Sequence, residues 1–555
     1  MNSGDYQWIN KIDGTGSDFT SSMYYFNNHI YLQSTSTNSS VNLYSQPGTG
    51  SNSQPSGQTE INFTNSYTGA FAKGTVISKF TTNGILISNI QTNYSSPSFK
   101  IDKDENMYLL FTTTNDNFQI NITTPTHTIE LQMVENKLYQ YTLVKLDKDY
   151  QLVWCRKYTS DTDYPISLSF CLYENHIYNI CNYKNTLEIY NDANQLLKTI
   201  QGSTNTYQFC LINYDKNGNL IWTTNTLPVE NNTNINSVTV NASKNGVYVY
   251  GYLNNTVESN FNVKFFNQDD IEFKNVSFIN NLTNSYWMFL CKYTHQGEAD
   301  WILSIDNLFP VTNIILFSEG LCIDPWGNIY FTTTSNNGKI YSSNTGLILT
   351  LSSNRFLIKI IAFGEIKWLS YISGGFIYFQ NIDCDYSGIY VSLKRENLSS
   401  TPGDTNFYNS DNTLFKSVSN SLYSITNNYK VMTFYVKYDF NGFIKWINFS
   451  VYNISNLSLR GVYIEYTNST SRIINNNSDI ISDKKGSLYI TGNYIAECKF
   501  IDNNTNEIIS ITKTLENGDK DLYIGKLFNY EPNSIPEINC VQFNDLKISL
   551  NRILN

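Results

Sequence analysis

Two short motifs alternate along this chain, and each recurs seven times. The first is a turn that ends in tryptophan, as in NGNLIW at 217–222 and FGEIKW at 363–368. Its last positions are Trp8, Ser88, Trp154, Trp222, Trp301, Trp368 and Trp446. The second is a turn followed by an apolar residue and a tyrosine, at Tyr31, Tyr108, Tyr178, Tyr248, Tyr330, Tyr390 and Tyr489. Two independent motifs that agree on seven copies predict a fold of seven equivalent units.

Both motifs are typical of β-hairpins. Glycine stands four residues before most of the tryptophans, and Gly and Asn accept the positive φ of tight hairpin turns. A lysine stands five residues before the turn position in most copies. Three copies depart from this pattern, because Ser88 replaces the tryptophan, Tyr150 the glycine and Asn213 the lysine.

Each repeated residue type has an expected role in packing. We expect the tryptophans to pack between neighbouring units; the alternative is that they stack on sugars or bases. The tyrosines should lie in the core with their hydroxyls satisfied at its edge, and the lysines should snorkel or pair with a carboxylate. Two hairpins per repeat give four strands, so the sequence predicts an all-β, seven-bladed β-propeller of four-stranded blades.

The order of the motifs resembles the SBBP-type β-propeller repeat, D-x-x-G-N-x-Y followed by F-x-x-K-x-x-x-x-G-x-x-x-W. CIDPWGNIYFTT at 322–333 and FLIKIIAFGEIKW at 356–368 carry this resemblance, which extends from residue 4 to about 530. It implies a fold rather than an activity, with the tyrosine hairpin as the inner strands and the tryptophan hairpin as the outer strands. The Asn-, Ile- and Tyr-rich composition is also similar to that of proteins from large AT-rich DNA viruses of amoebae.

The two ends of the chain are expected to complete one blade together. The strand at 521–530 lacks a following partner and residues 4–13 lack a preceding one, so the N-terminal strand should close the last blade. The expected blades are 18–95, 96–161, 162–228, 229–307, 308–374, 375–452, and 453–531 plus 4–13, followed by a tail or cap at 532–555. We expect the long segments between the two hairpins to be variable loops, although some of them, such as 261–278, are also compatible with extra strands.

Composition excludes several classes of protein. The 555 residues carry a net charge of -10 with only 37 Lys and Arg, which argues against nucleic-acid binding. Aromatic residues make up 15%, which argues against disorder. The N-terminal sequence MNSGDYQWIN has no apolar stretch, and no segment approaches the ~20 apolar residues of a membrane helix, so neither a signal peptide nor membrane insertion is expected. A virion or host-cytoplasm location is compatible with these features.

Metal and thiol chemistry have little support in the sequence. The nine cysteines are dispersed and should be free thiols, with a Cys171–Cys181 disulfide as the alternative. The four histidines are far apart in sequence, which argues against a zinc site. The turns at Asp102, Asp147 and Asp215 imitate the start of a calcium loop, but we expect these carboxylates to stabilise turns.

No catalytic motif, cofactor or metal site is expected. Asp269 and Asp270 are the candidate binding residues, in the segment 253–286. We expect a non-catalytic interaction or structural module, such as a virion component, that binds a protein partner or self-assembles. A glycan-binding propeller is the alternative, and a lyase or hydrolase that uses loop carboxylates is the third. Any partner is expected on the face that carries the long segments, such as 253–286 and 395–430.

Overall fold

The structure is a computed structural model of the whole chain. It describes residues 6–13, 18–36, 40–46, 56–62, 74–92, 98–113, 120–135, 137, 139–160, 168–229, 233–255, 261–268, 271–278, 285–308, 320–335, 338–342, 346–352, 354–374, 376–396, 404–418, 429–454, 479–482, 487–494, 497–501, 508–512 and 521–528. The segment 532–555, which was expected to be a tail or cap, lies outside these residues.

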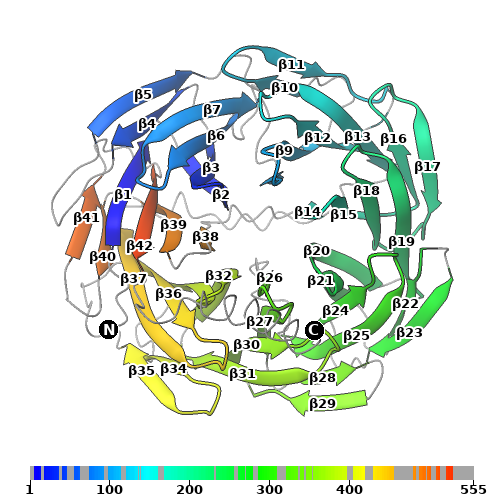
Figure 1. Cartoon of the computed structure of the whole chain (residues 1–555). Coiled ribbons are helices and arrows are strands. Elements are labelled where there is room, and N and C mark those ends of the chain that lie inside the picture. The colour runs from blue at the N-terminus through cyan, green and yellow to red at the C-terminus, as the bar shows by residue number, and fades with distance from the viewer. Residues whose placement is uncertain are drawn as a thin grey trace, which may run out of the picture.

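The described residues form an all-β fold of seven antiparallel sheets, which stand one beside the next around a common axis (Figure 1). We number the sheets along the chain and give their strands from the innermost to the outermost. Sheet 1 contains β2 (Asp18–Phe26), β3 (His29–Ser36), β6 (Gly74–Thr81), β7 (Leu86–Thr92), β10 (Ile120–Thr123) and β11 (Thr128–Leu131). Sheet 2 contains β8 (Ser98–Ile101), β9 (Met107–Thr113), β12 (Tyr139–Leu146), β13 (Leu152–Ser160), β16 (Thr186–Tyr190) and β17 (Leu196–Gln201).

The next three sheets have the same arrangement. Sheet 3 contains β14 (Leu168–Tyr173), β15 (His176–Tyr183), β18 (Gln208–Asp215), β19 (Leu220–Pro228), β22 (Phe261–Phe266) and β23 (Glu272–Phe278). Sheet 4 contains β20 (Thr233–Ser243), β21 (Gly246–Asn255), β24 (Ser285–Tyr293), β25 (Ala299–Leu308), β28 (Lys339–Ser342) and β29 (Gly346–Thr350). Sheet 5 contains β26 (Leu321–Ile323), β27 (Ile329–Ser335), β30 (Asn354–Ile360), β31 (Ile366–Ser373), β34 (Thr405–Tyr408) and β35 (Leu414–Val418).

The last of the seven sheets combines strands from the first and the last described parts of the chain. Sheet 6 contains β32 (Phe376–Asp385), β33 (Gly388–Glu396), β36 (Tyr429–Tyr438), β37 (Ile444–Ile454), β40 (Glu497–Ile501) and β41 (Ile508–Thr512). Sheet 7 contains β38 (Asp479–Ser482), β39 (Ser487–Tyr494), β42 (Asp521–Phe528), β1 (Tyr6–Asp13), β4 (Ser40–Gln46) and β5 (Ser56–Asn62). The pairing of β1 with β42 joins the N-terminal strand to the C-terminal one.

Each sheet has six strands, so the prediction of four strands per sheet was wrong. The two additional strands come from the long segments between the motifs, which were expected to be loops. Each of these segments forms an outer hairpin on the preceding sheet, as β22 does on β19 and β34 does on β31. The pairing satisfies the backbone groups of both the hairpin and the strand that would otherwise be an edge.

The core lies between neighbouring sheets. Apolar clusters join sheets 1 and 2, 2 and 3, 3 and 4, 4 and 5, and 5 and 6. A further cluster joins Ile30 and Leu32 of sheet 1 to Tyr489 and Ile524 of sheet 7. The innermost strands also contact one another in sequence, and β38 contacts β2.

The repeated tryptophan joins one sheet to the next by packing against a turn of the next sheet and donating a hydrogen bond to it, a contact that we call the lock. The Trp301 indole is 2% exposed, and its Nε1 donates to the Ala362 carbonyl, in a turn of the next sheet, at 3.0 Å. Lys292 Nζ donates to the same carbonyl at 3.0 Å. Gly364 lies against the indole with φ +82°, and a Cβ at this position would lie 3.1 Å from the Trp301 ring. Glycine is therefore required both for its backbone conformation and for the close approach.

The same lock recurs at other junctions. Trp154, Trp222 and Trp368 donate to the carbonyls of Lys216, His295 and Phe440 in the following sheets. Together with Trp301, these contacts confirm for four of the motif tryptophans the prediction that they pack between units. Cation–π contacts of 5.3–5.7 Å join Lys79 to Tyr31, Lys145 to Tyr108, Lys359 to Tyr330, Lys437 to Tyr390 and Lys526 to Tyr489.

Two departures from the repeat compensate for each other. Ser88 stands in the tryptophan position, and Tyr150 stands in the glycine position of the following sheet with φ 63°. Ser88 Oγ lies 3.4 Å from the Tyr150 hydroxyl, so the tyrosine ring extends into the space over Ser88.

Restoring the repeat residues at both positions tests this compensation. We expect Ser88→Trp alone to destabilise the protein because the Tyr150 ring occupies the site. The double variant Ser88→Trp with Tyr150→Gly should recover the lost stability, with a coupling of about 1–3 kcal/mol in a double-mutant cycle of denaturant unfolding. Additive effects would show that the two residues do not share one site.

Candidate functional site

The described hairpin turns of sheets 1–6 lie on one face of the molecule, which we call the hairpin-turn face. Successive strands of an antiparallel sheet alternate in direction, so the turns after the first, third and fifth strands lie at the same end. Hydrogen bonds between turns of neighbouring sheets agree with this arrangement. Gln268 N donates to Gly297 O, and Ser410 N donates to Gly442 O, both at 3.1 Å.

At each lock the tryptophan bonds to the backbone of an equivalent turn residue, but the side chain of that residue differs from junction to junction. The carbonyl that accepts the tryptophan Nε1 belongs to Lys216, His295, Ala362 or Phe440, depending on the junction. The backbone of these four residues is fixed by the same contact, whereas their side chains differ in size, charge and polarity. A surface of variable side chains on a rigid framework can be specific for one ligand.

Three aromatic side chains meet at the junction of sheets 5 and 6, and we call them the aromatic corner. Trp326 lies in the turn between β26 and β27, Tyr386 in the turn between β32 and β33, and Phe440 in the turn between β36 and β37. The Trp326 ring is nearly perpendicular to Tyr386 at 6.0 Å and to Phe440 at 4.9 Å. Trp326 and Tyr386 are 46% and 47% exposed, so the corner presents aromatic surface to solvent.

The corner stands on rigid turns. Asp324 Oδ1 accepts the Trp326 backbone N–H at 3.0 Å, and Asp324 Oδ2 accepts the Tyr330 hydroxyl at 2.9 Å. Gly327 has φ +87°, and Asn245 Nδ2 of the neighbouring sheet donates to its carbonyl at 3.4 Å. The tryptophan ring therefore has an exposed face but a fixed backbone.

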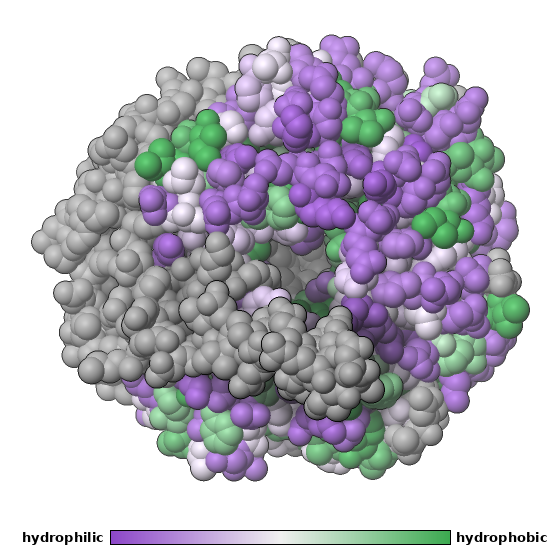
Figure 2. Space-filling view, in the orientation of Figure 1, coloured by the Kyte–Doolittle hydropathy of each residue, from purple (hydrophilic) through white to green (hydrophobic). Residues whose placement is uncertain are grey.

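Further apolar side chains are exposed at or beside the turns of the same face. They are Ile85, Ile87, Leu152, Val153, Leu196, Leu197, Ile221, Ile271, Leu347, Ile348, Phe363, Leu414, Phe415 and Phe443. Among the large exposed hydrophobic residues that the structure describes, only Val229 lies away from a turn of this face. On the face drawn in Figure 2, apolar residues form separate patches among hydrophilic ones. The exposed apolar residues therefore share one end of the sheets, which makes this face the candidate interaction surface.

A second aromatic group occupies the junction of sheets 3 and 4, where Asn213 replaces the repeated lysine. His295 stacks on Tyr173 at 5.0 Å, and its Nδ1 lies 2.7 Å from the Tyr178 hydroxyl. Its Nε2 lies 2.8 Å from Ser243 O, a carbonyl that can only accept. The Ser243 carbonyl therefore requires a proton on Nε2, and in the neutral ring the Tyr178 hydroxyl donates to Nδ1.

The second histidine of this junction is His176, which stacks on Tyr178 at 5.8 Å. Its Nδ1 lies 3.2 Å from Asn213 Oδ1. The fold therefore brings together two of the histidines that are far apart in sequence. Burial lowers the pKa of His295 and outweighs the hydrogen bond to the Ser243 carbonyl, which raises it. The nearby His176 and Lys292 lower the pKa further, and Glu174 raises it.

The lowered pKa of His295 predicts a pH dependence of stability. The unfolded chain takes up a proton near the ordinary histidine value of 6.5, before the folded chain does. The contribution of this residue is therefore complete above pH ~6.5 and is lost as the pH falls through the folded pKa. We expect His295→Gln, whose amide can both donate and accept, to lose less stability than the wild type between pH 7 and pH 5 in denaturant unfolding.

His29 serves as the reference for this experiment. The pKa of His29 is also lowered by burial, with Lys79 as a further cause. Its contribution to the pH dependence of stability therefore has the same sign in the wild type and in His295→Gln. The difference between wild type and His295→Gln isolates the His295 contribution. Identical pH profiles for the two proteins would contradict the assignment.

The aspartates that imitate a calcium loop are engaged in their own turns. Asp215 Oδ1 accepts the backbone N–H groups of Asn217 and Asn219 at 2.8 Å, and Oδ2 accepts the Asn219 amide at 2.7 Å. Asp102 and Asp147 accept equivalent turn N–H groups. These bonds confirm the prediction of turn stabilisation. Within the described residues, no three His, Cys, Asp or Glu side chains gather closely enough to hold a metal ion.

The remaining sequence candidates have different outcomes. Asp269 and Asp270 lie outside the described residues, so their role stays a prediction. Cys171 and Cys181 are free and buried, which confirms free thiols and excludes the disulfide between them, and burial raises the pKa of each to about 12. No helix in the described ranges has the length and apolarity to cross a membrane.

Sequence reasoning missed the aromatic corner, although one signal was present. Of the eight tryptophans, only Trp287 and Trp326 stand outside the tryptophan motif. A tryptophan that the repeat does not need is a candidate for another role. Comparison with known proteins finds no matching family model and no matching curated protein. The SBBP resemblance therefore stays a prediction.

Proposed function

We propose that the seven sheets are the blades of a closed seven-bladed β-propeller, with six strands in each blade. Three observations support this proposal. The innermost strands contact one another in order around the axis, an apolar cluster joins sheet 1 to sheet 7, and β1 pairs with β42 across the two ends of the chain. Radial repetition of antiparallel sheets is the arrangement of a propeller.

We further propose that this propeller is a non-catalytic module that binds a protein partner through its hairpin-turn face. The observation that carries the proposal is the aromatic corner, where Trp326 and Tyr386 are nearly half exposed on rigid turns. Exposed Trp and Tyr side chains held in one geometry lose little conformational entropy on binding and dominate protein interfaces. The repeated tryptophans and lysines, in contrast, are engaged in the locks between sheets.

This proposal changes the face on which a partner is expected. The sequence favoured the opposite end of the sheets because the long segments were expected to be free loops. Those segments instead form the outer hairpins, and the described turns of these hairpins lie on the hairpin-turn face. These segments differ in length from repeat to repeat, and this variation therefore falls on the outer hairpin of each sheet.

A binding experiment with surface variants tests this function. The tagged protein is isolated from the cells or particles that produce it, and stoichiometric partners are identified and quantified. We expect Trp326→Ala with Tyr386→Ala to weaken the main partner about 30-fold or more, as expected for hot-spot aromatics. Val229→Ala, which alters an exposed apolar residue away from this face, is the control and should bind as the wild type does. Equal binding by the double variant would refute the assignment of the face.

A further inference from the structure

Each of the seven sheets ends in an outermost strand that has no described neighbouring strand on its outer side. Figure 1 shows these strands around the rim of the molecule, namely β5, β11, β17, β23, β29, β35 and β41. The backbone groups along such an edge can pair with a strand of another chain, and proteins protect exposed edges with charged side chains, especially lysine. The charges on these seven strands therefore indicate which edges are protected.

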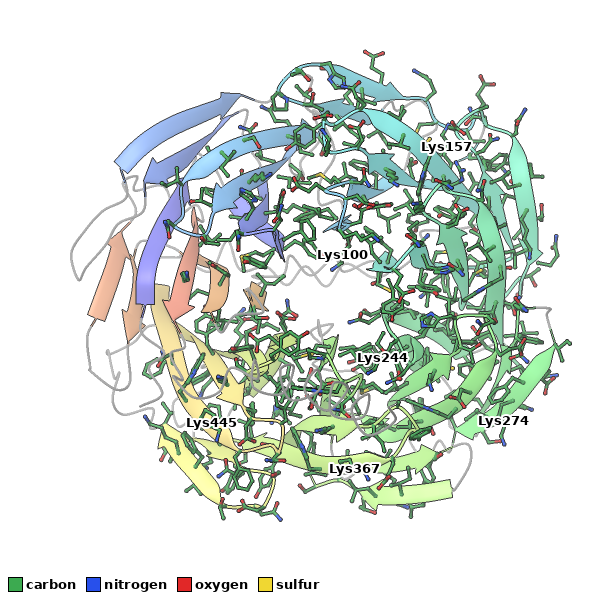
Figure 3. All side chains as sticks on the ribbon, in the orientation of Figure 1. Lys100, Lys157, Lys244, Lys274, Lys367 and Lys445 are labelled. Carbon is green, nitrogen blue, oxygen red and sulfur yellow. The ribbon has the colours of Figure 1, made fainter. Side chains whose placement is uncertain are left out.

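Three of the outermost strands carry a lysine at one equivalent position. Each lysine stands beside the β-bulge of its hairpin and opposite an apolar residue, in the pairs Ile189 with Lys198, Phe265 with Lys274 and Phe407 with Lys416. Figure 3 shows Lys274 at the outer edge of the ring of sheets. A strand that added to one of these edges would have to place its own side chains beside the charge, so the lysine protects the edge.

Three further outermost strands contain or adjoin other charges. β5 contains Glu60, and β11 contains Glu130, which is exposed. In the sequence, Glu507 and Lys513 flank β41 directly. Six of the seven edges therefore have a charge within the strand or directly beside it.

The outermost strand of sheet 4 is the exception. In β29 the position of the lysine is taken by Leu349, which stands opposite Ile340 beside the bulge of the β28–β29 hairpin. The strand reads GLILT, and no charged residue occurs at 340–354. Leu347 and Ile348 are 54% and 38% exposed. This edge therefore has exposed apolar side chains and lacks the charge that protects the equivalent edges.

The backbone of β29 offers its free groups at a defined position. Leu351 N donates to Gly338 O at 2.7 Å, so Leu351 directs its backbone groups towards β28. Successive residues of an antiparallel strand direct these groups to alternate sides. Thr350, which stands opposite Lys339, therefore directs its N–H and C=O away from β28. Within the described residues, no strand occupies that side of β29.

We propose that β29 pairs with β29 of a second copy of this chain, antiparallel and about a two-fold axis at Thr350. The two Thr350 residues then exchange N–H···O bonds, and Leu349 stands opposite Leu351 of the second copy. Cross-strand pairs of threonine and of apolar residues stabilise antiparallel strands. The added strand also covers part of the exposed apolar surface of Ile348.

The charges of the edges favour a second copy as the occupant. Self-pairing of β17, β23 or β35 in the same register would bring two lysines together on one face, and like charges on neighbouring strands disfavour pairing. Self-pairing of β29 brings no like charges together, because the strand is uncharged. It also uses the free edges of both copies, so the assembly closes at two chains. No residue of the aromatic corner lies on β29, so this inference goes beyond the proposed partner interface and does not depend on it.

Sedimentation velocity on the full chain tests the proposal. We expect a monomer–dimer equilibrium that shifts towards the dimer between about 1 µM and 1 mM, without larger species, because the interface is small. Hydrogen exchange measured by mass spectrometry follows the segment 346–352 in the same samples. Exchange in this segment should slow as the dimer forms, because the pairing engages the Thr350 amide.

Two variants target the edge without disturbing the hairpin. Leu349→Lys gives sheet 4 the lysine that β17, β23 and β35 carry at this position, and should weaken the dimer about tenfold or more. Thr350→Pro removes the outward N–H, which an edge strand tolerates, and should also weaken the dimer about tenfold or more because each copy loses a hydrogen bond. Unfolding midpoints show that each variant is folded.

The equivalent strand of sheet 2 supplies the matched controls. Thr199 corresponds to Thr350, because it follows Lys198 as Thr350 follows Leu349. Thr199→Pro should therefore dimerise as the wild type does. Lys198→Leu removes the charge from β17 and leaves the chain with two open edges, so it should form species larger than a dimer.

The aromatic corner gives a separate control. Trp326→Ala with Tyr386→Ala should dimerise as the wild type does, and Leu349→Lys should keep the partner binding expected of the hairpin-turn face. The failure of one proposal is thereby distinguishable from the failure of the other.

Several results would overturn the pairing of β29. A wild type that stays monomeric over the whole concentration range overturns it, and slow exchange at 346–352 in that monomer would show that another part of the chain occupies the edge. A dimer that persists in folded Leu349→Lys and Thr350→Pro shows that the contact lies elsewhere. Equal weakening by Thr199→Pro would show that the effect of proline is not specific to β29.

Discussion

Deletion of residues 1–13 is expected to abolish a soluble, monodisperse product. The deletion removes β1, which pairs with β42 at six positions from Tyr6 to Ile12 and with β4 at Ile12 and Asp13. Both neighbouring strands then become edges, and the outer hairpin of β4 and β5 loses its connection to sheet 7. Backbone hydrogen bonds contribute about 1 kcal/mol each, so the loss approaches the ~5–15 kcal/mol stability of a typical domain.

Size-exclusion chromatography with light scattering measures this result. Open edges recruit other chains, so the truncated protein should elute as aggregates or as exchanged oligomers. A synthetic peptide of residues 1–16, added during refolding, supplies β1 in trans and should restore a species with the mass of a single chain. A truncated protein that stays monodisperse with an unchanged melting temperature would refute the role of β1 in closing sheet 7.

The seven-fold organisation could be predicted because every repeat encodes its own hairpins locally. A turn with Gly or Asn and its flanking alternating residues specify a hairpin without reference to the rest of the chain. The packing of the tryptophans was also predictable, since a bulky ring at one position of six of the seven copies requires one common partner. That partner is the glycine turn of the next repeat, as Gly364 is for Trp301.

The six-stranded sheets could not be predicted in the same way. Each outer hairpin pairs with a strand of the preceding repeat, as β40 does with β37. The sequence of 497–512 contains no signal that names this partner, because strand pairing depends on position in space as well as on pattern. The hairpin itself was detectable only at 261–278, where the alternation of apolar residues is clearest.

The aromatic corner was missed for a related reason. Its three residues come from different turns, and the contact among them exists only because sheets 5 and 6 are adjacent. Trp326 could also be assigned to the tyrosine motif, in which its position is an ordinary turn residue. An isolated, solvent-exposed turn residue and one that contacts Tyr386 and Phe440 look the same in sequence. Only the tertiary arrangement tells them apart.

Trp301→Ala is expected to have the largest effect of any single substitution in the locks. The ring is almost completely buried, so its removal should destabilise the protein by about 3–5 kcal/mol through lost burial and the cavity that remains. The Ala362 carbonyl keeps its bond from Lys292, so the loss reflects packing more than an unsatisfied backbone group. Denaturant unfolding should show the change as a lower midpoint.

The matched control is the same substitution at the exposed tryptophan. Trp326→Ala removes an indole of the same size from the aromatic corner, where nearly half of the residue is exposed. Because no close-packed cavity is left, we expect a change in stability of less than about 1 kcal/mol, together with loss of partner binding. Trp301→Ala should show the reverse order of effects, with lost stability and retained binding in the folded fraction. If both variants lost stability equally, the distinction between a lock tryptophan and a binding tryptophan would be wrong.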